Sequence, residues 1–90
     1  MAEPPTIVAA AIVFKGTIYT VPTPGRHHNV FALIREMTGA NDVSVGEDGQ
    51  GFVTSDRRFA NRKEAAIIAI SAGQISKLKW PPLLYSEDLW

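Results

Sequence analysis

The stretch Ile7–Val21, IVAAAIVFKGTIYTV, predicts the first structural elements of the chain. Residues 6–14 are apolar and rich in β-branched side chains, and residues 17–21 alternate polar and apolar side chains as a half-buried strand does. The pair Lys15-Gly16 between them suits a tight two-residue turn. We therefore predict a β-hairpin near the start of the chain.

A helix is predicted after the loop Pro22-Thr23-Pro24-Gly25, whose prolines cannot continue a sheet ladder. From Asn29 onward, apolar side chains recur at three- and four-residue spacings up to Met37, and Gly39 supplies the C-terminal stop. This pattern predicts one amphipathic helix.

The second half of the chain predicts two short strands and a second helix. Residues 43–45 alternate apolar and polar side chains, and Phe52–Thr54 follows a loop with three glycines. Residues 56–60 form a turn, and Asn61 with Glu64 has the spacing of a capping box for a helix over 62–72. Because that helix is apolar almost all round, we expect it to be buried on more than one face.

The order of these elements predicts a single α+β domain over residues 1–90. It has a small antiparallel sheet covered on one face by two helices, and an extended C-terminal arm over 74–90. The aromatic stretch Trp80–Tyr85 of this arm leaves two interpretations open: it folds over its own core, or it builds an interface between subunits.

Composition excludes several classes of protein. Ninety residues leave no room for a multi-domain enzyme, and 46% hydrophobic with 20% charged residues is typical of a folded domain. Nine basic and nine acidic residues cancel, so no overall basic field attracts nucleic acid or an anionic membrane. The absence of cysteine excludes disulfides, a thiolate nucleophile and sulfur-ligated metal sites.

A chain without cysteine predicts a reducing cytosol as the simplest compartment, and its N-terminal residues predict neither a membrane span nor a signal peptide. The longest apolar run, Ile7–Phe14, is far shorter than the roughly 18 residues that cross a bilayer. The preceding residues carry an acid and two prolines where a signal peptide needs positive charge. We expect neither membrane insertion nor secretion.

Two clusters are candidate binding sites for an anion. Arg26-His27-His28 lies at the expected start of the first helix, where free backbone N–H groups favour phosphate. In the second cluster, around residues 56–63, the arginines suit a diphosphate, Phe59 offers a face for a base, and Asn61 suits a base or ribose hydroxyl. The alternative is structural: Asn61 caps the helix, one histidine and Phe59 pack inside, and the cations are solvated.

No catalytic or metal-binding signature is present. The serines lack a nucleophile elbow, the glycine-rich loop is not a P-loop, and adjacent His27 and His28 diverge too far to share a metal ion easily. We therefore expect no enzyme activity, no metal and no cofactor.

Several blocks together resemble a known family. They are Lys15–Thr20, His27-His28, Gln50–Asp56, Arg58-Phe59, Asn61–Ala66, Ala72–Gln74 and Leu84–Trp90. This ordered set resembles the first-described type of Thoeris anti-defence sponges, small phage proteins that sequester cyclic ADP-ribose signals in the bacterial host cytosol.

The resemblance implies binding without turnover, assembly into dimers or hexamers, and a second site for cyclic oligonucleotides in some relatives. It implies ligand-binding roles for eight residues: Arg26, His27, His28, Phe52, Arg58, Phe59, Asn61 and Arg62. Two features depart from the family pattern. Arg57 stands where glycine is usual, which disfavours a positive φ in that turn, and the Pro-Thr-Pro-Gly insert precedes the histidines.

The leading hypothesis is a sponge that buries an anionic cyclic nucleotide between subunits. The runner-up is a protein–protein inhibitor of a host enzyme that acts through the aromatic arm and the Arg57/Arg58 patch. A third hypothesis is a small hydrolase with His27 and His28 as acid and base.

Overall fold

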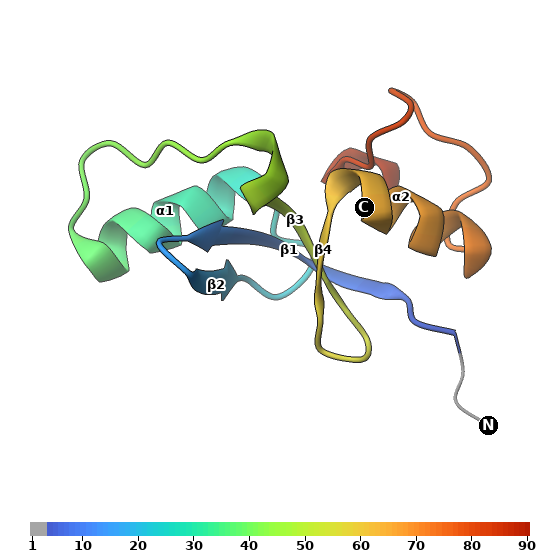
Figure 1. The fold of residues 1–90 in the computed structure, drawn as a ribbon, viewed down its shortest axis with the longest axis horizontal. Helices are drawn as coiled ribbons and strands as arrows, with labels where there is room; N and C mark the ends of the chain where they lie inside the picture. The colour runs from blue at the N-terminus through green and yellow to red at the C-terminus, as the bar shows by residue number, and fades with distance from the viewer. Residues whose placement is uncertain (1–3) are drawn as a thin grey trace.

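The computed structural model describes residues 4–90. They form a four-stranded antiparallel sheet with two helices (Figure 1). The strands are β1 (Ile7–Phe14), β2 (Thr17–Thr20), β3 (Gln50–Thr54) and β4 (Phe59–Asn61), in the sheet order β2-β1-β3-β4. The helices are α1 (His27–Thr38) and α2 (Arg62–Ser71), with short 3-10 turns η1 (Glu47–Gly49) and η2 (Ser86–Asp88). The predicted α+β class is confirmed.

The N-terminal hairpin forms where the sequence predicts it. Phe14 pairs with Thr17, and the two turn residues between them both have positive φ, 50° at Lys15 and 79° at Gly16. This is the backbone twist that two-residue hairpin turns need. β1 pairs on its other side with β3, so the hairpin forms one half of the sheet.

A single core forms between the sheet and both helices. α1 contacts β1 and β2, whereas α2 contacts chiefly β3 and β4. Ile12 and Phe52 of the sheet share one buried cluster with the apolar face of α1 and the alanines of α2. The small alanine side chains let α2 lie close to the strands. Both helices therefore cover the same face of the sheet.

Local capping fixes the helix ends. Asn61 Oδ1 accepts a hydrogen bond from the Glu64 backbone N–H (2.9 Å), and Glu64 Oε1 accepts one from Asn61 N–H (3.1 Å), which confirms the predicted capping box. Gly39 ends α1 in the left-handed region at φ 73°. α1 begins at His27, earlier than the helical spacing predicts, and Asn29 Oδ1 accepts from Arg26 N–H (2.8 Å).

Two predictions for the second half are wrong. Residues 43–45 form no strand: Val43 is buried in the core, but the backbone there is irregular. The partner of β3 is β4, which lies where the sequence predicts a turn. At Gly51 the two strands come so close that a Cβ would lie 2.0 Å from the Ala60 carbonyl oxygen.

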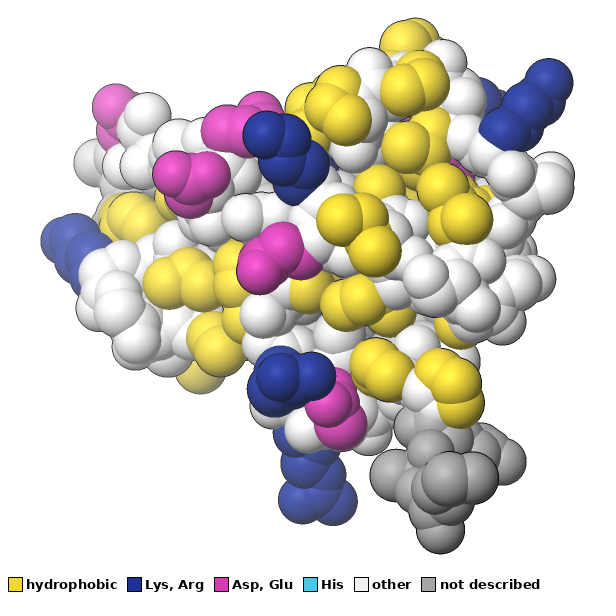
Figure 2. All heavy atoms as spheres, turned by 45° about the vertical axis from the view of Figure 1, so that its right-hand side comes forward, with side chains coloured by type: hydrophobic (Ala, Val, Ile, Leu, Met, Phe, Trp, Pro, Cys, Tyr) yellow, Lys and Arg dark blue, Asp and Glu magenta, His cyan; other side chains and the backbone are white. Residues whose placement is uncertain are grey.

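The expectation that α2 is buried on more than one face is also wrong. Its alanines face the sheet, while Ile67 and Ile70 are 67% and 45% exposed. Figure 2 shows apolar side chains spread over the side of the molecule that carries α2. The helix is apolar almost all round, yet Ile67 and Ile70 remain outside the core that its alanines join.

The C-terminal arm folds over the core of its own chain. Leu84 is fully buried, and its N–H donates to the Arg62 carbonyl oxygen (3.1 Å). Leu89 and Trp90 pack against the same cluster as the sheet and helices. Of the aromatic residues in the arm, Trp80 is the one that is mostly exposed, at 53%. The arm therefore completes the domain.

Candidate functional site

A small hollow lies at the start of α2. Its volume is about 180 Å³, and it is lined by Glu47, Asp48, Asn61, Arg62, Lys63 and Leu83. We call it the α2 hollow. Arg62 and Lys63 line it from the first turn of α2, and Glu47 and Asp48 line it from η1. Such a lining can bind a phosphate and also accept hydrogen bonds from hydroxyl or amino groups.

Arg62 is the unusual residue of the α2 hollow. Its side chain is 8% exposed; Nη1 donates to Gln50 Oε1 (2.7 Å) and lies 3.8 Å from Glu47 Oε1. The guanidinium carbon lies 4.8 Å from the centroid of the Tyr85 ring. Within residues 4–90, the buried Nε has no hydrogen-bond partner. A buried donor without a protein partner is rare in folded proteins.

The tip of the β3–β4 hairpin carries the second group of predicted residues. Asp56 accepts from the Thr54 hydroxyl and lies 2.9 Å from both Nε and Nη2 of Arg58. The Thr54 hydroxyl and then Arg58 hold the pKa of Asp56 below its ordinary value. Arg57 has φ 65°, in the left-handed region that the sequence predicts to be unfavourable for it. Thus Asp56 neutralises Arg58, while Arg57 is exposed.

Phe59 lies beside this tip and is half-buried. It lines a second hollow of about 120 Å³ together with Thr54, Arg58, Ala60, Glu64 and Ile68. This hollow and the α2 hollow flank the chain where β4 passes into α2. Arg58 and Phe59 are thus accessible together.

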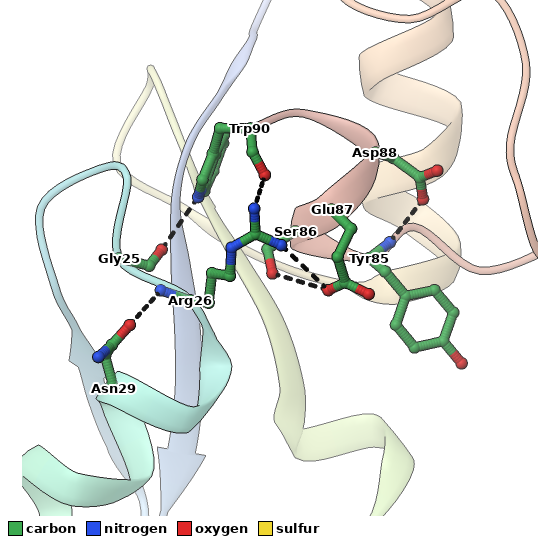
Figure 3. Close-up of polar contacts among 8 residues, drawn as sticks. All are labelled: Gly25, Arg26, Asn29, Tyr85, Ser86, Glu87, Asp88 and Trp90. Carbon is green, nitrogen blue, oxygen red and sulfur yellow. Dashed lines mark hydrogen bonds and ion pairs between the residues drawn. The ribbon is translucent and has the colours of Figure 1, made fainter.

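Arg26 binds the C-terminal arm of its own chain (Figure 3). Its Nη2 donates to the main-chain oxygen of Trp90, and its Nη1 lies 3.6 Å from Glu87 Oε1. Trp90 Nε1 in turn donates to the Gly25 carbonyl oxygen (3.1 Å). The arm therefore supplies the oxygens that surround Arg26, at the place where the sequence predicts a phosphate.

His27 lies beneath this contact and is 8% exposed. Its Nε2 lies 2.7 Å from the Gly51 carbonyl oxygen, which can only accept, so Nε2 carries the proton. Burial lowers the pKa of His27 to about 4, against the opposing effect of the Gly51 carbonyl. His27 is therefore neutral near pH 7.

Phe52 has no accessible ring face. It is fully buried, with its ring at right angles to those of His27 (5.0 Å between centroids) and Trp90 (6.5 Å). Stacking of a base on Phe52 would require Trp90 to move.

Residues 6–90 match the family described as phage T4 y16D protein. The chain belongs to this family. No curated protein and no solved structure matches it.

Membership of the y16D family supports the phage part of the sequence interpretation and assigns no ligand. Among residues 4–90 of this y16D-family chain, no group of three or more His, Asp or Glu side chains is placed to hold a metal ion. None of the helices in that part of the chain is long and apolar enough to span a membrane.

The structure divides the eight predicted ligand residues of the y16D-family chain into three groups. Arg26, His27 and Phe52 lie under the arm; Arg58, Phe59, Asn61 and Arg62 surround the start of α2; and His28 is exposed on α1. The first two groups approach each other across β3, because His27 contacts Gly51 and Arg62 contacts its neighbour Gln50. Neither of the two hollows is lined by both groups.

Sequence reasoning missed Gln50, Tyr85 and the acidic pair of η1. Gln50 and Tyr85 hold the Arg62 guanidinium, and Glu47 with Asp48 completes the α2 hollow. Glu47 and Asp48 follow Gly46 in a loop, and a polar loop is only a weak sequence indication of a binding site. No local pattern joins Tyr85 to Arg62, because the contact depends on how the arm folds back.

Proposed function

We propose that this y16D-family chain binds an anionic cyclic nucleotide, such as a cyclic ADP-ribose isomer, and holds it without cleaving it. Sequestering such a signal would suppress a bacterial anti-phage defence. The observation that carries the proposal is the lining of the α2 hollow, where the buried guanidinium of Arg62 and the exposed Lys63 lie beside the first turn of α2.

The lining of the α2 hollow is complementary to a nucleotide. Arg62 and Lys63 can bind phosphate oxygens through charge-assisted hydrogen bonds, which are stronger than neutral ones. Glu47 and Asp48 can accept from ribose hydroxyls or a base amino group. Gln50 and Tyr85 already orient the Arg62 side chain, so binding orders few new groups, which favours slow release.

The protonation state of His27 favours binding of a ligand without hydrolysis. Its Nε2 proton is engaged by Gly51, and its low pKa leaves it neutral near pH 7. A general acid needs a proton that it can release near the operating pH. His27 therefore lacks the property that the hydrolase hypothesis requires of it.

The volume of the α2 hollow supports a shared site. Pockets for drug-sized ligands usually enclose about 300–1,000 Å³, and this hollow encloses about 180 Å³. A dinucleotide-sized ligand would extend beyond it. We therefore propose that the chain acts as a homo-oligomer, in which a second subunit covers the rest of the ligand.

Equilibrium dialysis with a cyclic ADP-ribose isomer tests the site. Lys63→Ala removes an exposed cation, and Arg62→Lys keeps the charge but removes the planar guanidinium. We expect each variant to weaken binding at least tenfold. Arg35→Ala, which removes an exposed cation from α1, is the matched control and should bind as the wild type does. Equal affinity of the wild type and all three variants would show that the ligand does not bind in the α2 hollow.

One observation favours the protein–protein inhibitor as a second candidate. Trp80 is 53% exposed, and its ring lies at 81° to that of Tyr85 with 5.4 Å between the centroids. It lines a hollow of about 300 Å³ with Tyr85 and Glu87. Large exposed aromatics are typical of protein interfaces. On this hypothesis Trp80→Ala abolishes inhibition of the host enzyme and leaves nucleotide binding unchanged, whereas the sponge requires Lys63 and not Trp80.

A further inference from the structure

A hollow of about 300 Å³ in the C-terminal arm is lined by Trp80, Tyr85 and Glu87. We call it the Trp80 hollow. It shares no lining residue with the α2 hollow, so a group bound here would be separate from the nucleotide proposed above. Two aromatic rings beside one carboxylate attract positive charge, because an aromatic face carries a negative potential.

Main-chain hydrogen bonds fix the shape of the Trp80 hollow. Asp88 accepts from the Lys79 N–H at Oδ1 (3.2 Å) and from the Tyr85 N–H at Oδ2 (3.0 Å). One carboxylate thus ties together both ends of the segment that carries the two rings. Within this segment the Trp80 carbonyl oxygen accepts from the Leu83 N–H (3.1 Å). The rings are therefore already in place before a partner binds, which lowers the entropic cost of binding.

Trp80 is the ring that an incoming cation can reach. The guanidinium carbon of Arg62 lies 4.8 Å from the Tyr85 ring centroid, so Tyr85 already has a cation. Within residues 4–90, no lysine or arginine lies over Trp80. The perpendicular contact with Tyr85 covers at most one face of the indole, and 53% of Trp80 is exposed. One indole face therefore remains open, and indole is the aromatic ring that attracts cations best.

Glu87 supplies the negative charge of the Trp80 hollow. Its Oε1 accepts from the Ser86 hydroxyl (3.3 Å) and lies 3.6 Å from Arg26 Nη1. In the described part of the chain, Oε2 makes no hydrogen bond or ion pair. Figure 3 shows Glu87 between Arg26 and Tyr85. One carboxylate oxygen thus holds the arm near Arg26, and the other is available to a partner.

An indole face beside a carboxylate favours a guanidinium over other cations. A guanidinium is planar, so it can stack on the ring while its N–H groups donate, in the same plane, to the carboxylate. A lysine ammonium is a compact, strongly hydrated charge that does not stack. A quaternary ammonium has no N–H to donate. The lining therefore fits the side chain of arginine.

We propose that the Trp80 hollow binds an arginine side chain of a partner protein. The guanidinium stacks on the open face of Trp80 and donates to Oε2 of Glu87. The nearby arginines of this chain are engaged elsewhere, Arg26 at Trp90 and Arg62 at Gln50, so the bound arginine comes from a second protein. Arginine and tryptophan are the residue types that contribute most to protein interfaces.

NMR titration of the isotope-labelled full chain tests this site, with a glycine–arginine–glycine tripeptide blocked at both ends as the probe. The indole N–H signal of Trp80 should shift in a saturable way. The same tripeptide with citrulline, an uncharged isostere of arginine, should bind about tenfold more weakly, because the cation–π attraction and the charged hydrogen bond are both lost. The lysine tripeptide should also bind more weakly than the arginine tripeptide.

Two variants locate the binding in the Trp80 hollow. Trp80→Ala should abolish binding of the arginine tripeptide, and Glu87→Gln should weaken it about tenfold. Glu36→Gln, which neutralises an exposed carboxylate on α1, is the matched control and should bind as the wild type does. An unmoved Trp90 indole signal in Glu87→Gln shows that the arm stays docked, because that indole N–H donates to Gly25.

Three results would overturn the arginine site. They are equal binding of the citrulline and arginine tripeptides, an equal Trp80 shift with tetramethylammonium chloride, and normal binding by Trp80→Ala or Glu87→Gln. The site does not depend on the proposed nucleotide function. Trp80→Ala should retain a cyclic ADP-ribose isomer as the wild type does, so loss of tripeptide binding and loss of nucleotide retention are separate failures.

Discussion

At the scale of single residues, His27 makes the stability of the domain depend on pH. Its pKa of about 4 in the folded chain lies below the ordinary value of 6.5, because burial disfavours the charged ring. Below pH 6.5 the unfolded chain therefore takes up a proton that the folded chain does not. The free energy of unfolding should fall by up to about 3 kcal/mol between pH 6.5 and 4, at 1.36 kcal/mol per pKa unit.

Urea unfolding at a series of pH values measures this loss. His27→Gln should flatten the dependence between pH 6.5 and 4, whereas His28→Gln, which alters an exposed histidine, should leave it unchanged. The same slope in His27→Gln as in the wild type would show that His27 is not the group responsible.

The residue scale also shows what the sequence could and could not predict about the site. The sequence predicts Arg26 and Arg62 as anion-binding residues, because both are arginines near the start of a helix. Arg26 binds the C-terminal arm at Trp90, whereas Arg62 is held by Gln50 and Tyr85 in the lining of the α2 hollow. The contact of Arg26 with Trp90 joins residues 64 positions apart, and no local pattern encodes it.

At the scale of elements, glycines in the left-handed region should set the stability of the helix ends. Gly39 and Gly73 both have φ 73° with open space around them, so a Cβ there would be strained by the backbone alone. Gly39→Ala and Gly73→Ala should each lower the free energy of unfolding by about 1 kcal/mol. Gly46 also has open space but an ordinary φ of −67°, so Gly46→Ala is the control and should change little in thermal melts.

The cap of α2 links an element to the candidate site. Asn61→Ala removes the acceptor of the Glu64 N–H and should lower the free energy of unfolding by about 1 kcal/mol. Asn61→Asp keeps an acceptor at the cap and should retain the wild-type stability. Chemical denaturation distinguishes these outcomes, and equal stability of Asn61→Ala and the wild type would mean that the cap contributes nothing.

Elements with local signals were predicted well. The β1–β2 hairpin, the capping box of α2 and the Gly39 stop each depend on residues a few positions apart, and all three are confirmed. β4 was missed because three residues between a turn and a helix are too few to show a period. The strand predicted from the alternation at residues 43–45 is absent, because an irregular segment can bury Val43 as well as a strand can.

At the scale of the whole molecule, the C-terminal arm should be essential for folding. Leu84 is fully buried in the common core, so Leu84→Ala should lower the free energy of unfolding by about 2–5 kcal/mol. Trp80→Ala changes an exposed residue of the same arm and should cost much less. Equal losses for both variants in urea unfolding would contradict an arm that is part of the core.

The sequence alone left the arm ambiguous for a physical reason. Its aromatic residues lack periodicity, and aromatic side chains suit both a core and an interface. Tertiary contacts hold the arm on its own chain: the Arg62 carbonyl oxygen accepts from the Leu84 N–H, and the Gly25 carbonyl oxygen accepts from Trp90 Nε1. These contacts also place the arm between the two predicted anion sites.

Mass spectrometry of retained small molecules tests the proposal that the chain holds a cyclic nucleotide intact. The purified chain is incubated with the product mixture of a TIR-domain enzyme, unbound small molecules are removed by filtration, and heat releases what was retained for mass spectrometry. We predict recovery of an unaltered cyclic ADP-ribose isomer. An empty protein beside an untouched mixture, or release of a cleaved product, would contradict the claim.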